Sequence, residues 1–363
     1  MTPRRVTTLL IVGLLVIGLA MWVSSTRHLE RATAAGDLVM PGLTAGLNSI
    51  TEVRVRKGDG TATTLKKGSS SWRVGERDYP ADSGKVRKLL LDLAALKVVE
   101  EKTRTPENYP QLGVEEVNSP QATGTLVEAV APGKTYGLIV GKSSDAKSGY
   151  VRMTTSPQSV LAAPLLSLDA DARHWIDRTL IDLPLERIKE VNVKIGAQPA
   201  YTLSRANKEQ SDFAVADVPK GRELLTPDAA NSIASALTAL TSDDVHHAPA
   251  SNSAQTDLVH ATYRTFDGLV VDVTGRKDGT ADWIAIAASA TQGAVETEAR
   301  DLTTRVQGWE YEIPGYKYDA LFRPLADLLK KPPEKAPAKI AGKAGKETGS
   351  AGPGKQQQGD GGK

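Results

Sequence analysis

The chain has 363 residues, and its 45 basic and 43 acidic side chains leave a formal charge of only +2. This balance creates no overall field that would recruit nucleic acid or anionic lipid, and aromatic residues make up only 5% of the sequence. We therefore predict no nucleic-acid partner. The absence of cysteine from this sequence excludes disulfides and a cysteine nucleophile within it.

Residues 6–23 form a run of 18 residues without a charged side chain, preceded by Arg4 and Arg5. An α-helix of this length spans roughly 27 Å, close to the ~30 Å hydrocarbon core of a bilayer. The two arginines favour a cytoplasmic N-terminus. We therefore predict a cytoplasmic stub and single-pass transmembrane anchor over 1–27 and a tether over 28–47. The body would then lie outside the inner (cytoplasmic) membrane.

A cleaved signal peptide is the alternative interpretation of this run. Signal-peptide cores usually hold about 7–15 apolar residues followed by small residues at the cleavage site. Here the run is longer, and the bulky Met21 and Trp22 follow Ala20. A tryptophan at this position also suits the interfacial belt of a bilayer, so the uncleaved anchor is favoured.

The region beyond the tether repeats itself. The pattern Ile-x-Glu-Val-x-Val occurs at 50–55 and again at 188–193, with the alternation of a half-buried strand. A second strand-like piece follows in each unit, centred on Leu65 and on Leu203. Aromatic-x-Val pieces come next, at 72–74 and 213–215.

Each unit then continues into an expected helix and a hairpin. Apolar residues recur at helical spacing, at Val86, Leu89, Leu90, Leu93 and Leu96 in the first unit and at Ile233, Leu237 and Leu240 in the second. Pro227 and Asp228 suit the first turn of the second helix. A hairpin at 136–153 resembles one at 269–286, and Val98 and Val245 follow the two helices at the same offset.

The predicted fold class is α+β, with two duplicated units of mostly antiparallel sheet and one packed amphipathic helix each. The first unit covers 48–164 and the second covers 187–331, which ends in an aromatic segment and a short helix. A connector over 165–186 joins the units. From 332 to 363 Lys, Gly, Pro and Gln dominate, and this composition predicts a disordered tail.

Few segments suggest chemistry. His246 and His247 follow two aspartates, but adjacent side chains on a strand point to opposite faces, so a shared metal is disfavoured and the motif is interpreted as a loop that leaves a helix. The GKSS sequence at 141–144 lacks the upstream glycine of a phosphate-binding loop and favours a hairpin. A denser polar cluster, which on a helix would offer a metal or acid–base trio, contains Asp169, Asp171, His174 and Asp177. The alternative is a connector in which Trp175 enters the core and the charges stay solvated.

The order of these motifs resembles a bacterial family grouped as domain of unknown function 4340. The resemblance rests on the SSWRV and YPAD segments, the helix and strand over 85–103, the segment ending in Leu-Gly-Val at 112–114, the LIVGK and GYVR strands, and HWIDR at 174–178. It covers roughly residues 45 to 325. The resemblance implies a membrane-anchored extracytoplasmic protein that is often associated with gliding-type ABC transport systems. It implies no catalytic or cofactor-binding residue.

We accordingly predict a non-enzymatic accessory or scaffold subunit of an ABC-type transport or envelope complex. Its partners would be the bilayer, through residues 6–23, and transporter permease or ATPase subunits; no cofactor or metal is predicted. The alternative is an envelope ligand-binding protein for polysaccharide or peptidoglycan fragments, and a hydrolase using the Asp169 to Asp177 cluster is a third hypothesis. The candidate ligand or partner surface consists of Trp175, Asp177, Arg178, Trp309, Tyr311 and Tyr316.

Overall fold

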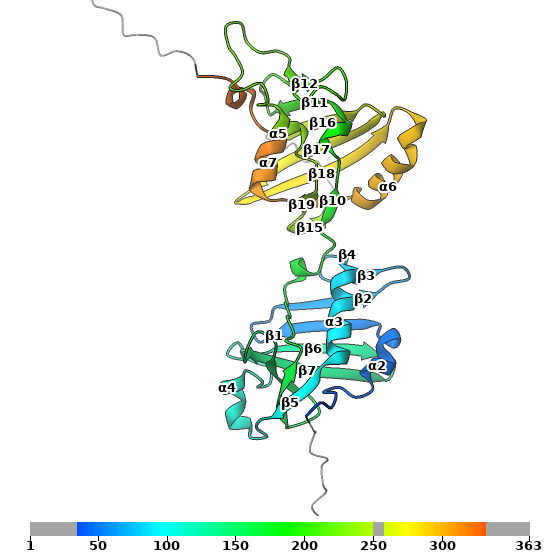
Figure 1. The fold of residues 1–363 in the computed structure, drawn as a ribbon, viewed down its shortest axis with the longest axis vertical. Helices are drawn as coiled ribbons and strands as arrows, with labels where there is room; N and C mark the ends of the chain where they lie inside the picture. Colours follow the sequence, from blue (N-terminus) through cyan, green and yellow to red (C-terminus); the bar gives the residue numbers. More distant parts are fainter. Residues whose placement is uncertain (1–34, 250–257, 332–363) are drawn as a thin grey trace, which may run out of the picture.

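The computed structural model describes residues 35–249 and 258–331. Two lobes lie end to end in it, each a sheet with helices packed against it (Figure 1). Every pairing between the described sheet strands is antiparallel, which confirms the predicted mixed α+β class with few helices. Buried apolar side chains of both lobes belong to one continuous core.

The first lobe holds nine described strands in the order β4-β3-β2-β1-β6-β7-β8-β9-β5. These strands are β1 (Glu52–Lys57), β2 (Ala62–Lys67), β3 (Trp72–Val74), β4 (Tyr79–Pro80), β5 (Lys97–Glu101), β6 (Thr125–Ala131), β7 (Lys134–Ser143), β8 (Gly149–Met153) and β9 (Ser159–Ala163). Its helical segments are α2 (Leu43–Gly46), η1 (Leu47–Ser49), α3 (Ser83–Ala95), η2 (Pro106–Asn108), α4 (Tyr109–Leu112) and η3 (Ala172–His174).

The second lobe holds eight described strands in the order β13-β12-β11-β16-β17-β18-β19-β15, and β10 pairs with β14 beside them. The strands are β10 (Thr179–Ile181), β11 (Ile188–Ile195), β12 (Tyr201–Ser204), β13 (Ala214–Val215), β14 (Leu240–Thr241), β15 (Asp244–His247), β16 (Val259–Thr265), β17 (Leu269–Asp278), β18 (Ala281–Ala290) and β19 (Trp309–Glu312). The helical segments are η4 (Leu185–Arg187), α5 (Asn231–Ala234), η5 (Gly293–Val295), α6 (Glu296–Val306), α7 (Gly315–Leu321) and η6 (Leu325–Leu328).

The two sheets correspond strand by strand. From β3 to β5 the first order matches the second from β13 to β15, and β4 is an additional edge strand. The repeated strand motif also keeps its register, because Val53 pairs with Leu65 in one sheet and Val191 with Leu203 in the other. The hairpin β7–β8 likewise corresponds to β17–β18.

Helix α3 follows from its sequence. Asp82 caps it, its side chain accepting hydrogen bonds from the backbone N–H groups of Gly84 and Lys85. The apolar stripe is buried against the sheet: Val86, Leu89, Leu90 and Leu93. The 3.6-residue period and the cap therefore agree about where this helix begins and which face it buries.

The second predicted helix is much shorter than expected. Only α5 (Asn231–Ala234) is α-helical; Leu240 lies in β14, and Pro227 and Asp228 lie in a turn before α5. The residues after α5 pair elsewhere: the Leu237 carbonyl accepts from the Leu183 N–H, and Leu240 pairs with Ile181 of β10, so tertiary pairing replaces the rest of the helix. Helix α6 is an element that the sequence pattern does not reveal.

The predicted tether ends earlier than residue 47. Leu38 pairs with Lys97 at the edge of β5, and the Val39 N–H donates to the Leu96 carbonyl at 2.9 Å. Met40 and Leu43 are buried. The chain is therefore part of the first lobe from about residue 36, because these apolar side chains complete the core beside α3.

No helix within the described ranges has the length and apolar character that a bilayer crossing requires. The predicted anchor over 6–23 and the predicted tail over 332–363 lie outside the described residues.

Candidate functional site at the junction of the lobes

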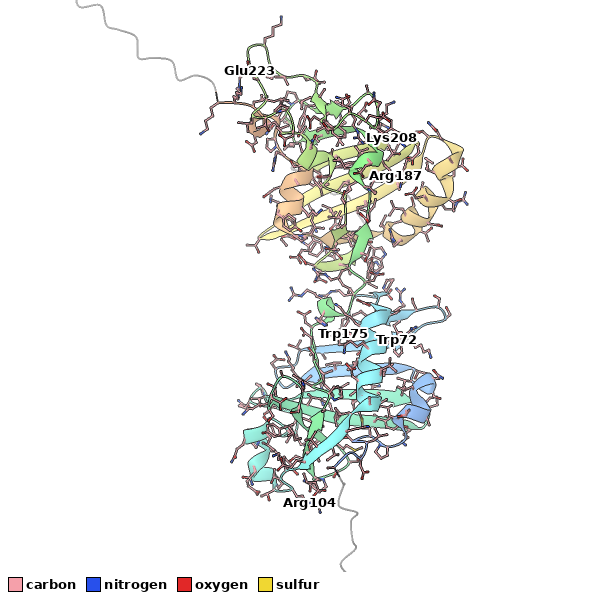
Figure 2. All side chains as sticks on the ribbon, viewed as in Figure 1. Trp72, Arg104, Trp175, Arg187, Lys208 and Glu223 are labelled. Atoms are coloured by element: carbon pink, nitrogen blue, oxygen red, sulfur yellow. The ribbon has the colours of Figure 1, made fainter. Side chains whose placement is uncertain are left out.

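Trp175 is not available as a ligand platform, contrary to the sequence prediction. It lies in the first lobe, near the junction with the second (Figure 2). It is 2% exposed, and its indole N–H donates to the Asp169 carbonyl at 2.7 Å. The short η3 turn folds the indole into the core of the first lobe. The structure therefore agrees with the alternative, in which this tryptophan has a packing role.

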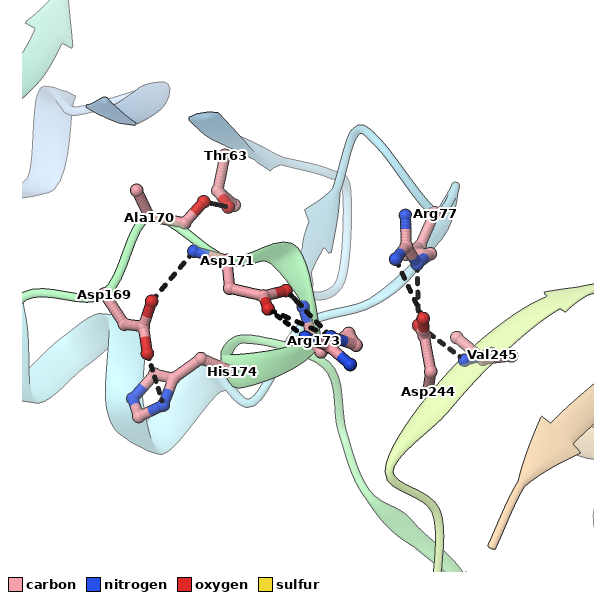
Figure 3. Close-up of polar contacts among 9 residues, drawn as sticks. All are labelled: Thr63, Arg77, Asp169, Ala170, Asp171, Arg173, His174, Asp244 and Val245. Atoms are coloured by element: carbon pink, nitrogen blue, oxygen red, sulfur yellow. Dashed lines mark hydrogen bonds and ion pairs between the residues drawn. The ribbon is translucent and has the colours of Figure 1, made fainter. Parts of the chain in front are cut away.

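The polar cluster around it does not form the trio expected from a helix. Asp171 precedes η3 and pairs with Arg173 at 2.6 Å, and this hydrogen-bonded pairing lowers the pKa of Asp171 (Figure 3). His174 Nδ1 lies 3.7 Å from Asp169 Oδ2. Asp177 instead accepts a hydrogen bond from the Thr179 N–H. Across the described part of the chain, no group of three or more His, Asp or Glu is placed to hold a metal ion.

Asp177 and Arg178 belong to a segment that joins the two lobes, the connector strand over 175–181. The Asp177 N–H donates to the Pro80 carbonyl in the first lobe at 2.9 Å, and the Asp82 N–H donates to the Trp175 carbonyl at 2.8 Å. The Ser242 N–H in the second lobe donates to the Arg178 carbonyl, and the Arg178 guanidinium donates to the Ser242 carbonyl and pairs with Asp243. The first half of the connector strand is thus paired with the first lobe, and its second half is paired with the second lobe.

The aromatic residues of the predicted surface do not form one exposed surface in the structure. Tyr311 is fully buried, so its prediction as a surface residue is wrong, whereas Tyr316 is 72% exposed. Trp309 is half-buried, with its ring 5.0 Å from that of Tyr79 in an edge-to-face arrangement. Tyr79 also meets Tyr311 edge to face at 6.0 Å. Tyr79 therefore inserts between aromatic side chains of the second lobe.

Charged contacts flank this aromatic junction. The Arg77 guanidinium forms two hydrogen bonds with the Asp244 carboxylate, at 2.7 and 2.8 Å, and this bonding raises the pKa of Arg77 (Figure 3). His247 stacks on Trp309 with ring centroids 4.0 Å apart, and its Nε2 lies 3.8 Å from Asp78 Oδ2. The Arg77–Asp244 and Asp78–His247 contacts both join the first lobe to the second.

A groove of about 450 Å³ opens beside these contacts, and we call it the junction groove. Its lining residues are Gly75, Glu76, Arg77, Asp78, Asp244, Val245, His246, His247 and Trp283. His246 lies 3.5 Å from Glu310 and packs on Trp283 at 4.1 Å, whereas His247 packs on Trp309, so the two imidazoles have different neighbours. The groove offers carboxylates, imidazoles and an indole to a polar ligand.

Comparison with known families matches residues 72–260 to the family described as Domain of unknown function (DUF4340). The matched segment is just over half of the chain. The chain belongs to this family. No curated protein and no solved structure matches it. The DUF4340 match runs from β3 into β16, so it includes Arg77, the connector strand and Asp244.

Other motifs within the DUF4340 match have structural roles. The GKSS sequence lies at the end of β7, in the predicted hairpin. Lys142 Nζ donates to the carbonyls of Pro110 and Gln111 at 3.2 and 3.1 Å. A Cβ on Gly141 would lie 2.2 Å from the Leu112 carbonyl oxygen, so glycine is required there. These residues hold α4 against the first sheet.

The junction residues of this DUF4340 protein were not predicted as a site. Arg77 and Tyr79 lie in a turn and a two-residue strand, and neither has a distinctive local pattern. The TSDDVHH sequence was interpreted as a loop that leaves a helix, but Asp244 to His247 form strand β15. The correspondence of Val245 with Val98 was the available signal, because it places Asp244 to His247 on an edge strand.

Proposed function

We propose that this chain is a non-enzymatic, membrane-anchored extracytoplasmic accessory subunit that acts as a rigid scaffold in an ABC-type transport or envelope complex. The observation that carries the proposal is the connector strand, which is hydrogen-bonded to Pro80 and Asp82 in the first lobe and to Ser242 in the second. Two lobes joined by a paired strand form a spacer of fixed length. The apolar run at 6–23 and the family resemblance supply the membrane and transporter parts of the proposal.

Affinity purification of the full-length chain from native membranes in mild detergent tests this function. We expect permease or ATPase subunits to co-purify in stoichiometric amounts. The matched control replaces residues 1–27 with a cleavable signal peptide, and the co-purified subunits should then be lost. Recovery of the full-length chain alone would exclude a stable complex.

Ligand binding in the junction groove is the second candidate function. The half-buried indole of Trp283 lies in a groove with Glu76 and Asp78, and sugar-binding proteins use aromatic faces and carboxylates to recognise rings and hydroxyls. Calorimetric titration with soluble peptidoglycan fragments tests it. We expect binding that Trp283→Ala weakens at least tenfold, while Trp72→Ala in the other lobe leaves it unchanged; absence of heat would exclude this candidate.

A further inference from the structure

A second groove, on the first lobe, lies between α3, the end of β2 and the η1 turn. We call it the α3 groove, and its volume is about 410 Å³. Its lining residues are Leu47, Asn48, Lys67, Trp72, Arg87, Leu90 and Leu91. Leu91 is 52% exposed on the outer face of α3, and Trp72 is only half-buried. Exposed leucine beside an accessible indole is a feature of protein-binding surfaces.

The charged side chains that line the α3 groove are all basic. Lys67 and Arg87 are both exposed, and none of the described residues that line the groove carries a carboxylate. Lys67 Nζ donates to the Asn48 carbonyl at 3.1 Å. Arg87 has no ion-pair partner within residues 35–249 and 258–331. Cations next to an apolar groove favour a partner that carries acidic groups.

The second lobe fills the corresponding position with its own side chains. Lys67 corresponds to Arg205, since both come two residues after the paired leucines of the repeated strands. Arg205 is 5% exposed, donates to the Leu185 carbonyl at 2.7 Å, and lies 4.9 Å from the centre of the Phe213 ring. Phe213, the counterpart of Trp72, is 1% exposed. The same place in the repeat is therefore closed in one lobe and open in the other.

We propose that the α3 groove is the docking site for an acidic, amphipathic segment of a partner protein. An apolar side chain of that segment would pack between Trp72 and Leu91, and its carboxylates would pair with Lys67 and Arg87. The proposal rests on the proposed function, because the partner is a subunit of the same complex. Tryptophan and arginine are also the residues that dominate binding energy at protein interfaces.

The chain's own C-terminal segment does not suit this groove. Residues 332–363 contain six lysines and three acidic residues, so the segment would bring positive charge to a positive groove. Its single large apolar side chain, Ile340, is flanked by Lys339 and Lys343. The charge pattern therefore favours a different polypeptide as the occupant.

Photo-crosslinking in native membranes tests the proposal with the full-length chain. p-Benzoylphenylalanine is incorporated in place of Leu91, and in place of Leu225 as a control with the same 52% exposure on the second lobe. We expect a protein adduct from position 91 whose crosslinked peptide has an apolar residue flanked by Asp or Glu. The combined Lys67→Glu and Arg87→Glu changes should reduce its yield at least tenfold. Lys88→Glu, on the same helix but outside the groove, should not.

The adducts also separate this proposal from the proposed function. An adduct with lipid only, with a second copy of the chain, or with a segment that lacks acidic residues would overturn the docking proposal. So would an adduct whose yield does not depend on Lys67 and Arg87. If position 91 gives no adduct while transporter subunits still co-purify, the docking proposal for the α3 groove is wrong and the proposed scaffold function stands. If co-purification fails as well, both are wrong.

Discussion

At the scale of single residues, the Arg77–Asp244 pair joins the two lobes through two hydrogen bonds. Both side chains are largely removed from solvent, with exposed fractions of 29% and 14%. The planar guanidinium of Arg77 donates one hydrogen bond to each carboxylate oxygen of Asp244. A lysine ammonium could not reproduce this bidentate geometry. Removing the guanidinium would leave a half-buried carboxylate that, among residues 35–249 and 258–331, keeps the Val245 N–H as its hydrogen-bond donor.

We expect Arg77→Ala to lower the free energy of unfolding by about 1–3 kcal/mol, because Asp244 loses its charged partner in a partly buried place. Urea unfolding followed by circular dichroism measures this change. The matched control is Lys88→Ala, which breaks the exposed pair between Lys88 and Asp92 and should cost less than about 0.5 kcal/mol. Equal effects of the two variants would contradict a special role for Arg77.

Glu312 gives the junction a pH dependence. Burial, with the negative charges of Asp244 and Asp243, raises the pKa of Glu312 above its ordinary value of 4.5. The folded protein therefore binds this proton more tightly than the unfolded chain does, so stability is lost as pH rises from about 4.5 through the raised pKa. We expect Glu312→Gln to reduce this loss and to stabilise the protein at pH 7.

Urea unfolding at pH 4.5 and at pH 7 checks the effect of Glu312→Gln. The exposed Glu209→Gln change serves as its control and should follow the wild type at both pH values. An identical pH dependence for Glu312→Gln and the wild type would show that this carboxyl does not titrate differently on folding.

Single-residue predictions from the sequence succeeded where local geometry decides and failed where tertiary packing decides. Val86, Leu89 and Leu93 were expected on one apolar face of a helix, and all three are buried in α3. Trp175 and Tyr311 were expected on a binding surface, but both are buried. An aromatic side chain has no local pattern that distinguishes a core position from an exposed one.

At the scale of elements, α3 is the helix that local sequence features predict most fully. Its cap, its apolar period and its length agree, and the helix is present as expected. We expect Asp82→Ala to cost about 1 kcal/mol, since the N–H groups of Gly84 and Lys85 lose their acceptor.

Thermal and urea unfolding measure the loss of the cap. Asp228→Ala is the matched control from the second repeat, because Asp228 lies in a turn and its side chain caps no helix in the described residues. This control should change stability by less than about 0.5 kcal/mol. A similar loss in both variants would mean that the Asp82 side chain does not act as a cap.

The second repeat shows why the remaining elements were harder to predict. Its strands kept the period-2 signal, so β11 and β12 were recognisable. Its helix did not form at full length, because Leu237 and Leu240 pair with Leu183 and Ile181. The connector strand could not be predicted from the sequence either, since its partners Pro80 and Ser242 are distant in sequence. Long-range hydrogen bonds leave no periodic pattern.

At the scale of the whole molecule, the repeats form one body. The aromatic contacts of Tyr79, the Arg77–Asp244 pair and the connector strand all join the same two surfaces. The repeat itself was visible in the sequence, whereas the junction was not. The two lobes differ in the additional strand β4, in the length of the helix after the third strand, and in the α3 groove, which is open in the first lobe only.

The rigidity of this two-lobed body is the central claim, and a distance measurement between spin labels tests it most directly. The absence of native cysteine allows labels at Lys88→Cys and Arg300→Cys, two exposed positions on opposite lobes. Double electron–electron resonance on the full-length chain should give one narrow distance distribution. A Gly-Ser-Gly-Ser insertion between residues 177 and 178 should broaden it. A broad distribution in the uninterrupted chain would contradict the claim, because it would mean that the lobes move independently.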